Sequence, residues 1–252
     1  MKGSNLIQRV LGISKVLNKQ REILSKLDSI DRYQKEVYYA EVFRDSVKDC
    51  KWLINHAFSP TGAAFNYGSL YFLYRVLDKM RPKRILEFGL GQSSKLIHQY
   101  SSFFDDVFAV TYEHDSQWVD FFKKEINQLY PINIHLAELE NVFYNQRLTL
   151  SYKNNCVELE SEKFDVILVD GPYGSEHYSR SQILHLVPDC LPSSFCIMLH
   201  DSEREGEKET ISELTGILNK SGIKHVTAVI SPTNYQDLFV WCSEDLRYLL
   251  TI

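Results

Sequence analysis

The spacing of hydrophobic residues divides the chain into two parts that meet near residue 60. In the first part an apolar residue recurs every three or four positions, with Gln20 in the one missing place, and the stripe consists of Leu6, Val10, Ile13, Leu17, Leu24 and Leu27. This heptad-like spacing predicts an amphipathic helix, and a second helical stretch, rich in aromatic residues, is expected at 32–57. Proline, glycine and asparagine interrupt the pattern at 58–69. We therefore expect a helical extension over residues 1–60 and a second domain over residues 61–252.

In the second part, strand-like and helix-like runs alternate. Short apolar runs are expected to form strands at 84–88, 107–113, 132–137, 164–170 and 194–200, with helical patterns between them. The last two strand-like runs, 224–230 and 237–243, are six residues apart, which is too short for a helical crossover, so they must be antiparallel. This order predicts an α/β fold: a doubly wound, mostly parallel seven-stranded sheet with a terminal antiparallel hairpin. The segment "QRLTLSYKNNCVELES" predicts an inserted hairpin that turns at Asn154 and Asn155.

The charges separate the two parts further. The net charge of −5 provides no global basic field, so we expect no nucleic-acid partner. Residues 1–30 nevertheless carry six Lys and Arg against two acidic residues. Three interpretations of the first helix stay open. It packs on its own domain, it forms a homo-oligomer through a short coiled coil, or it makes a peripheral contact with an anionic membrane surface.

The five cysteines, Cys50, Cys156, Cys190, Cys196 and Cys242, are scattered and contain no CxxC pair. We expect free thiols in a reducing compartment, without a disulfide framework or a zinc site. No run approaches the ~18 apolar residues of a transmembrane span, and the N-terminus lacks the apolar region of a signal peptide. The expected location is therefore cytoplasmic.

The stretch "RILEFGLGQSSKLIHQY", 84–100, places a glycine-rich turn directly after the first expected strand. A dinucleotide fingerprint would need a third glycine where this chain has Ser94. The carboxylate of Glu87, two residues before Gly89, would repel a pyrophosphate but could pair with the ammonium of S-adenosylmethionine. Glu113 ends the second expected strand, twenty-two residues after Gly91, where a carboxylate that binds a ribose is expected.

Four stretches carry a resemblance to a known family: "FGLGQSS", "VTYEHDSQW", "VDGPYGSEHYSR" and "LHDSEREGE". Over residues 67–252 the chain resembles the class I, Rossmann-like, S-adenosylmethionine-dependent methyltransferases. Within them it looks like the polysaccharide O-methyltransferases of the glucuronoxylan 4-O-methyltransferase type. By position, the resemblance implies that Glu87, Gly89, Gly91 and Ser93 line the methionine part of the cofactor, Glu113 the ribose hydroxyls, and His114 and Glu138 the adenine, while Asp170 faces the methyl group.

The ends of the fourth and fifth expected strands hold the candidate catalytic residues Asp170, His200 and Asp201. A sugar hydroxyl is very weakly acidic, so its methylation needs a base, a metal ion or both. Asp170 and Asp201 are the residues that would hold Mg²⁺ or Mn²⁺; in the alternative, His200 is the base and a carboxylate orients it. The metal site of the catechol-type O-methyltransferases is matched incompletely. Ser202 stands where that group has asparagine, and Tyr173 stands where it has a lysine base.

On the acceptor side we expect Tyr173, Arg180 and Arg204, because arginine suits bidentate recognition of an acidic sugar or a phosphate. The expected function is that of an S-adenosylmethionine-dependent O-methyltransferase, acting on a carbohydrate or a related hydroxylated metabolite. Two alternatives stay open: a small-molecule O- or N-methyltransferase on the same scaffold, and a non-catalytic protein that binds the cofactor.

Overall fold

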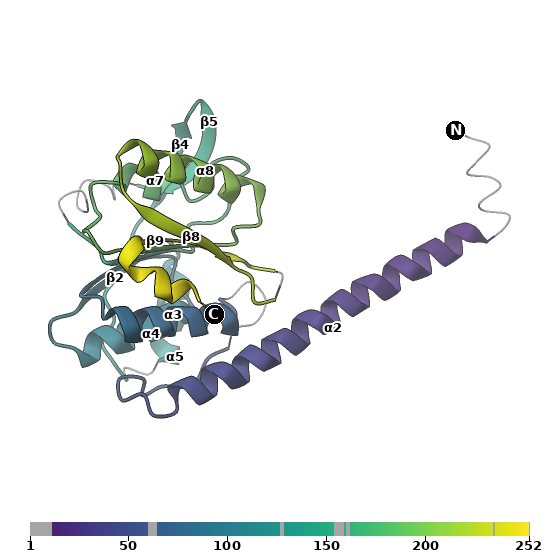
Figure 1. The fold of residues 1–252 in the computed structure, drawn as a ribbon, viewed down its shortest axis with the longest axis horizontal. Coiled ribbons are helices and arrows are strands. Elements are labelled where there is room, and N and C mark those ends of the chain that lie inside the picture. Colours follow the sequence, from purple (N-terminus) through teal and green to yellow (C-terminus); the bar gives the residue numbers. More distant parts are fainter. Residues whose placement is uncertain are drawn as a thin grey trace.

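The computed structural model describes residues 12–59, 65–126, 129–153, 159, 162–233 and 235–251 of the 252-residue chain (Figure 1). Among the described residues, two helices precede the sheet: α2, Ile13–Val47, and α3, Tyr67–Met80. The strands of the main sheet are β1 Arg84–Phe88, β2 Phe108–Glu113, β3 Ile134–Leu136, β6 Val166–Val169, β7 Cys196–His200, β8 His225–Ile230 and β9 Leu238–Ser243. The helices between and after them are α4 Gln92–Phe103, α5 Ser116–Glu125, α7 Gln182–Leu186, α8 Glu205–Lys220 and the 3₁₀ helix η1 Glu244–Leu250.

The main sheet has the strand order β3-β2-β1-β6-β7-β9-β8. All neighbours are parallel except β9, which pairs antiparallel with both β7 and β8. The expected α/β class, with a doubly wound sheet and a terminal antiparallel hairpin, is therefore confirmed. Because β2 and β3 extend to one side of β1, and β6 and β7 to the other, the strand order reverses between β1 and β6. This is the point at which open α/β sheets bind their ligands.

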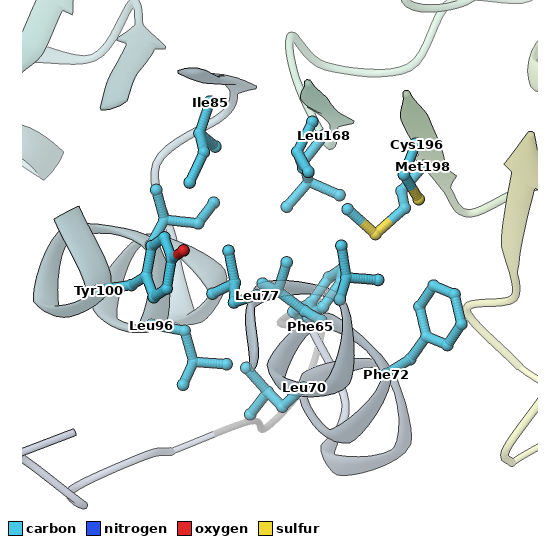
Figure 2. Close-up of a cluster of buried hydrophobic side chains, with 14 of the residues drawn as sticks. Phe65, Leu70, Phe72, Leu77, Ile85, Leu96, Tyr100, Leu168, Cys196 and Met198 are labelled. Carbon is cyan, nitrogen blue, oxygen red and sulfur yellow. The ribbon is translucent and has the colours of Figure 1, made fainter. Parts of the chain in front are cut away.

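The sheet separates two hydrophobic cores. Alternate residues of each strand point to opposite faces, so Ile85 joins the first core and its neighbour Leu86 joins the second. Figure 2 shows the first core, in which side chains of α3 and α4 pack against Ile85, Leu168 and Met198 of the sheet. The second core lies under α7 and α8. Both faces of the central strands are covered, which explains why their sequences are almost continuously apolar.

The inserted hairpin exists, but its strands are not the expected ones. It pairs β4, Leu139–Tyr144, with β5, Arg147–Tyr152, as a separate two-stranded sheet. The turn lies at Asn145 and Gln146, both of which have a positive φ, as a two-residue hairpin turn requires. The prediction of a turn at 154–155 was wrong for this hairpin, and those two residues lie outside the described part of the chain.

From residue 12 to residue 59, which the structure describes, the N-terminal segment forms one helix where the sequence predicted two. Helix α2 runs without interruption through 28–32, where we expected the first helix to give way to the second, and it ends at Val47 rather than near residue 57. No proline or glycine separates the two stretches, so nothing in the backbone breaks the hydrogen-bond ladder. Leu6 and Val10 of the expected stripe lie outside the described residues.

The two ends of α2 have different surroundings. Near its C-terminus, Phe43 and Val47 are buried in the first core together with Trp52 and Leu53. The N-terminal half projects away from the rest of the molecule (Figure 1), and its apolar residues Leu17, Leu24 and Leu27 are between 42% and 59% exposed. The expected extension over residues 1–60 thus contributes to the core at its C-terminal end. Among the described residues, no helix is apolar and long enough to span a membrane.

Four cysteines lie in the described segments, and all of them are free thiols. Cys190, Cys196 and Cys242 are buried, and Cys50 is partly buried. This agrees with the expectation of unpaired thiols; Cys156 lies outside the described residues.

Candidate functional site

A pocket of about 760 Å³ opens at the carboxyl ends of β1, β2, β6 and β7. Its volume falls within the usual range for small-molecule sites. It is lined by Ser59, Phe65, Gly89, Leu90, Gly91, Gln92, Glu113, His114, Asp115, Trp118, Phe121, Glu125, Tyr152, Asp170, Gly171, Pro172, Tyr173, Gly174, Arg180, Asp201 and Arg204. Most of the residues that the sequence singled out therefore meet in one place.

The floor of the pocket is a close contact between two backbone segments. Gly89 has φ +96°, and a Cβ on it would lie 2.8 Å from the backbone carbon and oxygen of Asp170. Gly171 faces it from the other side, with the backbone of Gly89 2.8 Å from where its own Cβ would be. Side chains at either position would separate the ends of β1 and β6. Gly91 differs, because a Cβ there would meet no atom within 4 Å and would point into open space.

Glu87 is fully buried beneath this turn and does not line the pocket. Its two carboxylate oxygens accept hydrogen bonds from the hydroxyls of Ser93, at 2.6 Å, and of Ser94 and Thr111, at 2.7 and 2.6 Å. Burial raises the pKa of Glu87 to about 7, although the three hydroxyls act in the opposite direction. Glu87 and Ser93 thus hold the glycine turn to the start of α4, and their contact with a cofactor stays a prediction.

Glu113 reaches the pocket from the end of β2. One of its oxygens accepts a hydrogen bond from the backbone N–H of Leu90 at 3.0 Å, and the other accepts from the N–H groups of His114 and Asp115. These contacts tie the end of β2 to the glycine turn after β1. The ring of His114 lies in the pocket wall, edge-on to Tyr173 with 4.5 Å between the ring centroids.

Glu138 is not among the residues that the pocket brings together. Its side chain is 81% exposed and forms an ion pair with Lys153 at 3.1 Å, at the start of the inserted hairpin. Its contact with an adenine stays a prediction that this arrangement does not support.

A buried cluster of charges forms the opposite wall. The guanidinium of Arg180, only 4% exposed, lies 3.3 Å from Asp170 and 2.8 Å from Asp201, and its Nε lies 3.8 Å from Glu207. His200 Nδ1 lies 2.9 Å from the same oxygen of Asp170, so with the proton on that nitrogen it donates to the carboxylate. Burial alone would raise the pKa of Asp170, but His200 and Arg180 outweigh it and the pKa is lowered. Asp170 is therefore an ionised carboxylate at the pocket surface.

The backbone is strained where this cluster forms. Arg180 has φ +62° and Asp201 has φ +59°, a conformation that costs non-glycine residues of order 1 kcal/mol or more. Their side chains pair with each other, and Arg180 also donates to the backbone oxygen of His200. Strain at both ends of one ion pair marks a geometry that the surrounding fold maintains, as is common at functional sites.

The cluster contains the three groups that could hold a metal ion, since ligand atoms of Asp170, His200 and Asp201 all lie within 4.8 Å of one another. The guanidinium of Arg180 already contacts both carboxylates, however, and Arg204 Nη1 lies 2.9 Å from Asp201. The charges of Asp170 and Asp201 are thus balanced by Arg180 and Arg204, although Asp201 Oδ1 has no hydrogen-bond partner among the described residues. The donor set as it stands does not fit a divalent ion.

The acceptor-side residues separate into two groups. Arg180 lines the pocket but is buried, and its guanidinium pairs with Asp170 and Asp201 while its Nε has no hydrogen-bond partner among the described residues; its contact with an acceptor stays a prediction. Tyr173 and Arg204 are 64% and 42% exposed in the pocket rim. His200 is fully buried behind Asp170, its ring 4.9 Å from Phe65, and its Nε2 has no hydrogen-bond partner among the described residues.

Sequence reasoning missed several residues of the site. Trp118 and Phe121 of α5 stack with 5.3 Å between their centroids and line the pocket beside Glu113. Tyr152 of β5 packs on Phe88 and closes the pocket floor. Trp118 could have been predicted from the sequence, because it lies in the stretch "VTYEHDSQW", which carries part of the resemblance. Nothing in the sequence indicates that Tyr152, on the inserted hairpin, returns to this site.

The chain is similar to several solved structures of methyltransferases, all at low sequence identity and with TM-scores below 0.5. No sequence profile of a known family matches the chain. No curated protein matches it either. An O-methyltransferase of Bacillus cereus, solved in complex with SAH, is 16% identical with a TM-score of 0.48, and the match covers 85% of this chain and 96% of that one. A precorrin-6y C5,15-methyltransferase of Geobacter metallireducens GS-15 is 14% identical with a TM-score of 0.47, covering 75% and 94%.

A third solved structure, the O-methyltransferase TomG of Streptomyces achromogenes, involved in tomaymycin synthesis and solved with SAM, is 13% identical with a TM-score of 0.45, covering 85% of this chain and 95% of that one.

Proposed function

We propose that the chain is an S-adenosylmethionine-dependent O-methyltransferase. The observation that carries the proposal is the position of Glu113. A carboxylate fixed by three backbone N–H groups stands at the end of β2, next to a glycine turn that leaves open space at Gly91. The glycine turn lies at the reversal of strand order, where an α/β sheet binds its ligand, and Glu113 at the end of the neighbouring β2 borders the same pocket.

The residues present fit such a cofactor. Glu113 lines the pocket together with His114, Trp118 and Phe121, whose rings supply aromatic surface. We assign Glu113 to the ribose hydroxyls, and the rings beside it to the adenine. Gly91 leaves room for the amino-acid part. When bound, the cofactor supplies an electrophilic methyl group to a nucleophilic oxygen.

Asp170 is the residue of this chain best placed to act on an acceptor hydroxyl. It lines the pocket, its pKa is lowered, and it is held from behind by His200 and Arg180. We propose that Asp170 accepts the hydrogen bond of the acceptor hydroxyl and takes its proton, while His200 positions the carboxylate. This assigns the contact with the acceptor to Asp170 rather than to the buried His200. Asp201 holds Arg180 and Arg204 in place.

We propose further that transfer does not need a divalent cation. Arg180 supplies the positive charge between Asp170 and Asp201, at distances of 3.3 and 2.8 Å, that a metal ion would otherwise supply.

For the acceptor we propose an acidic hydroxylated molecule, a carbohydrate being the class that the resemblance implies. The support from the structure is Arg204, which has one nitrogen on Asp201 and a side chain 42% exposed at the pocket rim. A half-exposed guanidinium can pair with a carboxylate or a phosphate. The glucuronoxylan type and the cytoplasmic location stay predictions.

The cofactor proposal is tested by filling the pocket without disturbing the fold. In Gly91→Leu the side chain enters open space, and φ −166° is accessible to any residue, so we expect a folded protein that no longer binds S-adenosylmethionine. Gly216→Leu is the matched control, because a Cβ at Gly216 on α8 also meets nothing within 4 Å and lies outside the pocket. Titration calorimetry measures both. Unchanged affinity in Gly91→Leu contradicts the proposed site.

Transfer is then followed by mass spectrometry with labelled cofactor and a panel of acidic sugars, neutral sugars and catechols. We expect transfer to an acidic acceptor, loss of at least tenfold in kcat for Asp170→Asn, and no effect of EDTA. Loss of activity with EDTA, restored by Mg²⁺ or Mn²⁺, contradicts the role of Arg180. Cofactor binding without transfer to any acceptor would favour the non-catalytic alternative.

A further inference from the structure

Helix α2 exposes a row of apolar side chains to water, which we call the α2 stripe. It consists of Ile13, Val16, Leu17, Ile23, Leu24, Leu27, Ile30, Val37 and Tyr38, each between 40% and 64% exposed. β-Branched residues recur every seven positions from Val16 to Val37, and we assign them to heptad position d. With this assignment, every residue of the stripe lies at position a, d or e. The polar residues at those positions are Gln20 and Gln34, both at a, and Asp31 at e.

The α2 stripe faces away from its own domain. Helix α2 contacts the domain through Arg32, which lies over the ring of Tyr235 at 5.4 Å, and through Glu36, which accepts a hydrogen bond from the N–H of Tyr67 at 2.9 Å. Arg32 and Glu36 occupy heptad positions f and c, on the opposite side of the helix from a and d. The domain therefore anchors α2 by one face and leaves the other uncovered. This disagrees with the interpretation that the whole helix packs on its own domain.

We propose that the α2 stripe is a self-association surface, on which the α2 helices of two or more copies of this chain pack in parallel and in register. In that arrangement Gln20 meets Gln20 and Gln34 meets Gln34 of the neighbouring copy. Each amide offers a donor and an acceptor to its counterpart. Polar residues at single a positions set the register of coiled coils in the same way.

The charges at the edge of the stripe agree with the parallel arrangement. Position g of one helix lies beside the following e position of its parallel neighbour, so Lys26 comes beside Asp31 of the other copy. In an antiparallel pair, position a faces d instead, and both glutamines would oppose Val or Ile without a hydrogen-bond partner. That would leave buried polar groups unsatisfied, which is costly.

The size of the α2 stripe is sufficient for a stable interface. Nine side chains that are about half exposed offer roughly 800 Å² per helix, similar to one partner's share of a standard protein interface. Because β-branched residues at d disfavour two-stranded coiled coils, and the stripe extends to e, a bundle of three or four helices fits best.

An anionic membrane surface is a less suitable partner. Gln20, Asp31 and Gln34 would enter the acyl region with the apolar residues, where polar groups are costly. The polar face of α2 is not predominantly basic either, since Glu22 pairs with Lys26 at 2.7 Å and Asp31 with Lys35 at 2.8 Å. Binding to anionic lipid relies on an excess of basic residues on that face.

The first experiment measures the mass of the full-length chain by light scattering over a wide range of concentrations. We expect a multiple of the chain mass for the wild type and a monomer for Ile23→Asp/Ile30→Asp, which places two charges at position d. The control Asn18→Asp/Ser25→Asp adds the same charge at the exposed f positions and should associate as the wild type does. A wild type that stays monomeric at every concentration overturns the proposal.

The second experiment tests orientation and the competing partner. In Val16→Cys, mild oxidation should cross-link two chains, because only a parallel, in-register pair brings both positions 16 together; the wild type, with its own cysteines, is the control. Absence of this cross-link in an associated protein overturns the parallel register. Sedimentation with phosphatidylserine–phosphatidylcholine vesicles covers the alternative. A monomer whose vesicle binding is lost in Ile23→Asp/Ile30→Asp would assign the stripe to a membrane surface instead. These outcomes do not depend on cofactor binding or transfer.

Discussion

Gly89 lies where the backbones after β1 and β6 approach each other beneath the pocket. Its positive φ and the 2.8 Å distance from a Cβ to the backbone of Asp170 both exclude a side chain. We expect Gly89→Ala to lower the free energy of unfolding by at least about 2 kcal/mol, since strain and overpacking add. Gly216→Ala is the control and should leave stability equal or slightly higher, because alanine favours a helix interior. Urea unfolding measures both. Equal stability of the two variants would contradict the close packing at the pocket floor.

Glu87 makes stability depend on pH in an unusual direction. Its pKa is about 7 in the folded protein, above the ordinary value of 4.5, so the folded state holds a proton that the unfolded state releases. The contribution to stability is fully present below pH 4.5 and is lost as the pH rises through 7. Relative to Glu87→Gln, the wild type should therefore lose about 2.5 kcal/mol between pH 5 and pH 8.

Guanidinium unfolding of both proteins at the two pH values checks this expectation. The comparison also cancels the opposite contribution of the buried His98, whose pKa burial lowers to about 4 and which is present in both proteins. A difference between wild type and variant that does not change with pH would show that Glu87 is ionised in the folded state.

For single residues, the sequence indicated which side chains stand at the ends of the strands, but it did not indicate which other side chains they contact. Glu113 and Asp170 could be located because a glycine turn and an apolar run precede them. The role of Arg180 could not be predicted, since its burial depends on a loop after β6 that returns between two strand ends. Neither the ion pair with Asp201 nor the positive φ of both residues has a sequence signal.

Among the elements, α2 combines a buried end with an exposed one. Phe43 packs its ring against those of Phe58 and Tyr67, with centroids at 5.3 and 6.0 Å. We expect Phe43→Ala to cost about 3–5 kcal/mol in unfolding free energy, whereas Asp45→Ala in the same turn, which removes only an exposed ion pair with Lys48, should leave the unfolding midpoint unchanged. Urea unfolding separates the two. A small effect of Phe43→Ala would mean that α2 is not part of the core.

For the helices and strands, hydrophobic periodicity was sufficient to locate some elements and not others. All seven strands of the main sheet were expected within two residues of their ends, because buried parallel strands are short apolar runs between turns. The inserted hairpin was placed too late in the chain. All six residues of its first strand, β4, are half-buried or exposed, and the strand therefore gives only a weak hydrophobic signal. The length of α2 was also not predicted. Its C-terminal end packs in the first core and its N-terminal half is exposed, so the spacing of apolar residues differs between the two ends.

For the whole molecule, the arrangement of its layers follows from the order of strands and helices. The doubly wound arrangement was implied by the alternation of strands and helices, and the antiparallel pairing of β8 and β9 by the short connection between them. The position of the reversal, between β1 and β6, was not predicted. The position of α2 relative to the domain was not predicted either, because an amphipathic pattern shows that a helix has an apolar face without showing what covers it.

The projection of α2 also determines how the protein moves through solvent. At 1.5 Å per residue its 35 residues extend about 52 Å, while a domain of ~200 residues has a radius of gyration of about 17 Å. A rod attached to a sphere has a higher frictional ratio than a sphere of equal mass, and it diffuses more slowly. Even a single chain should therefore elute early from a sizing column, and its X-ray scattering should show a long tail in the distribution of interatomic distances.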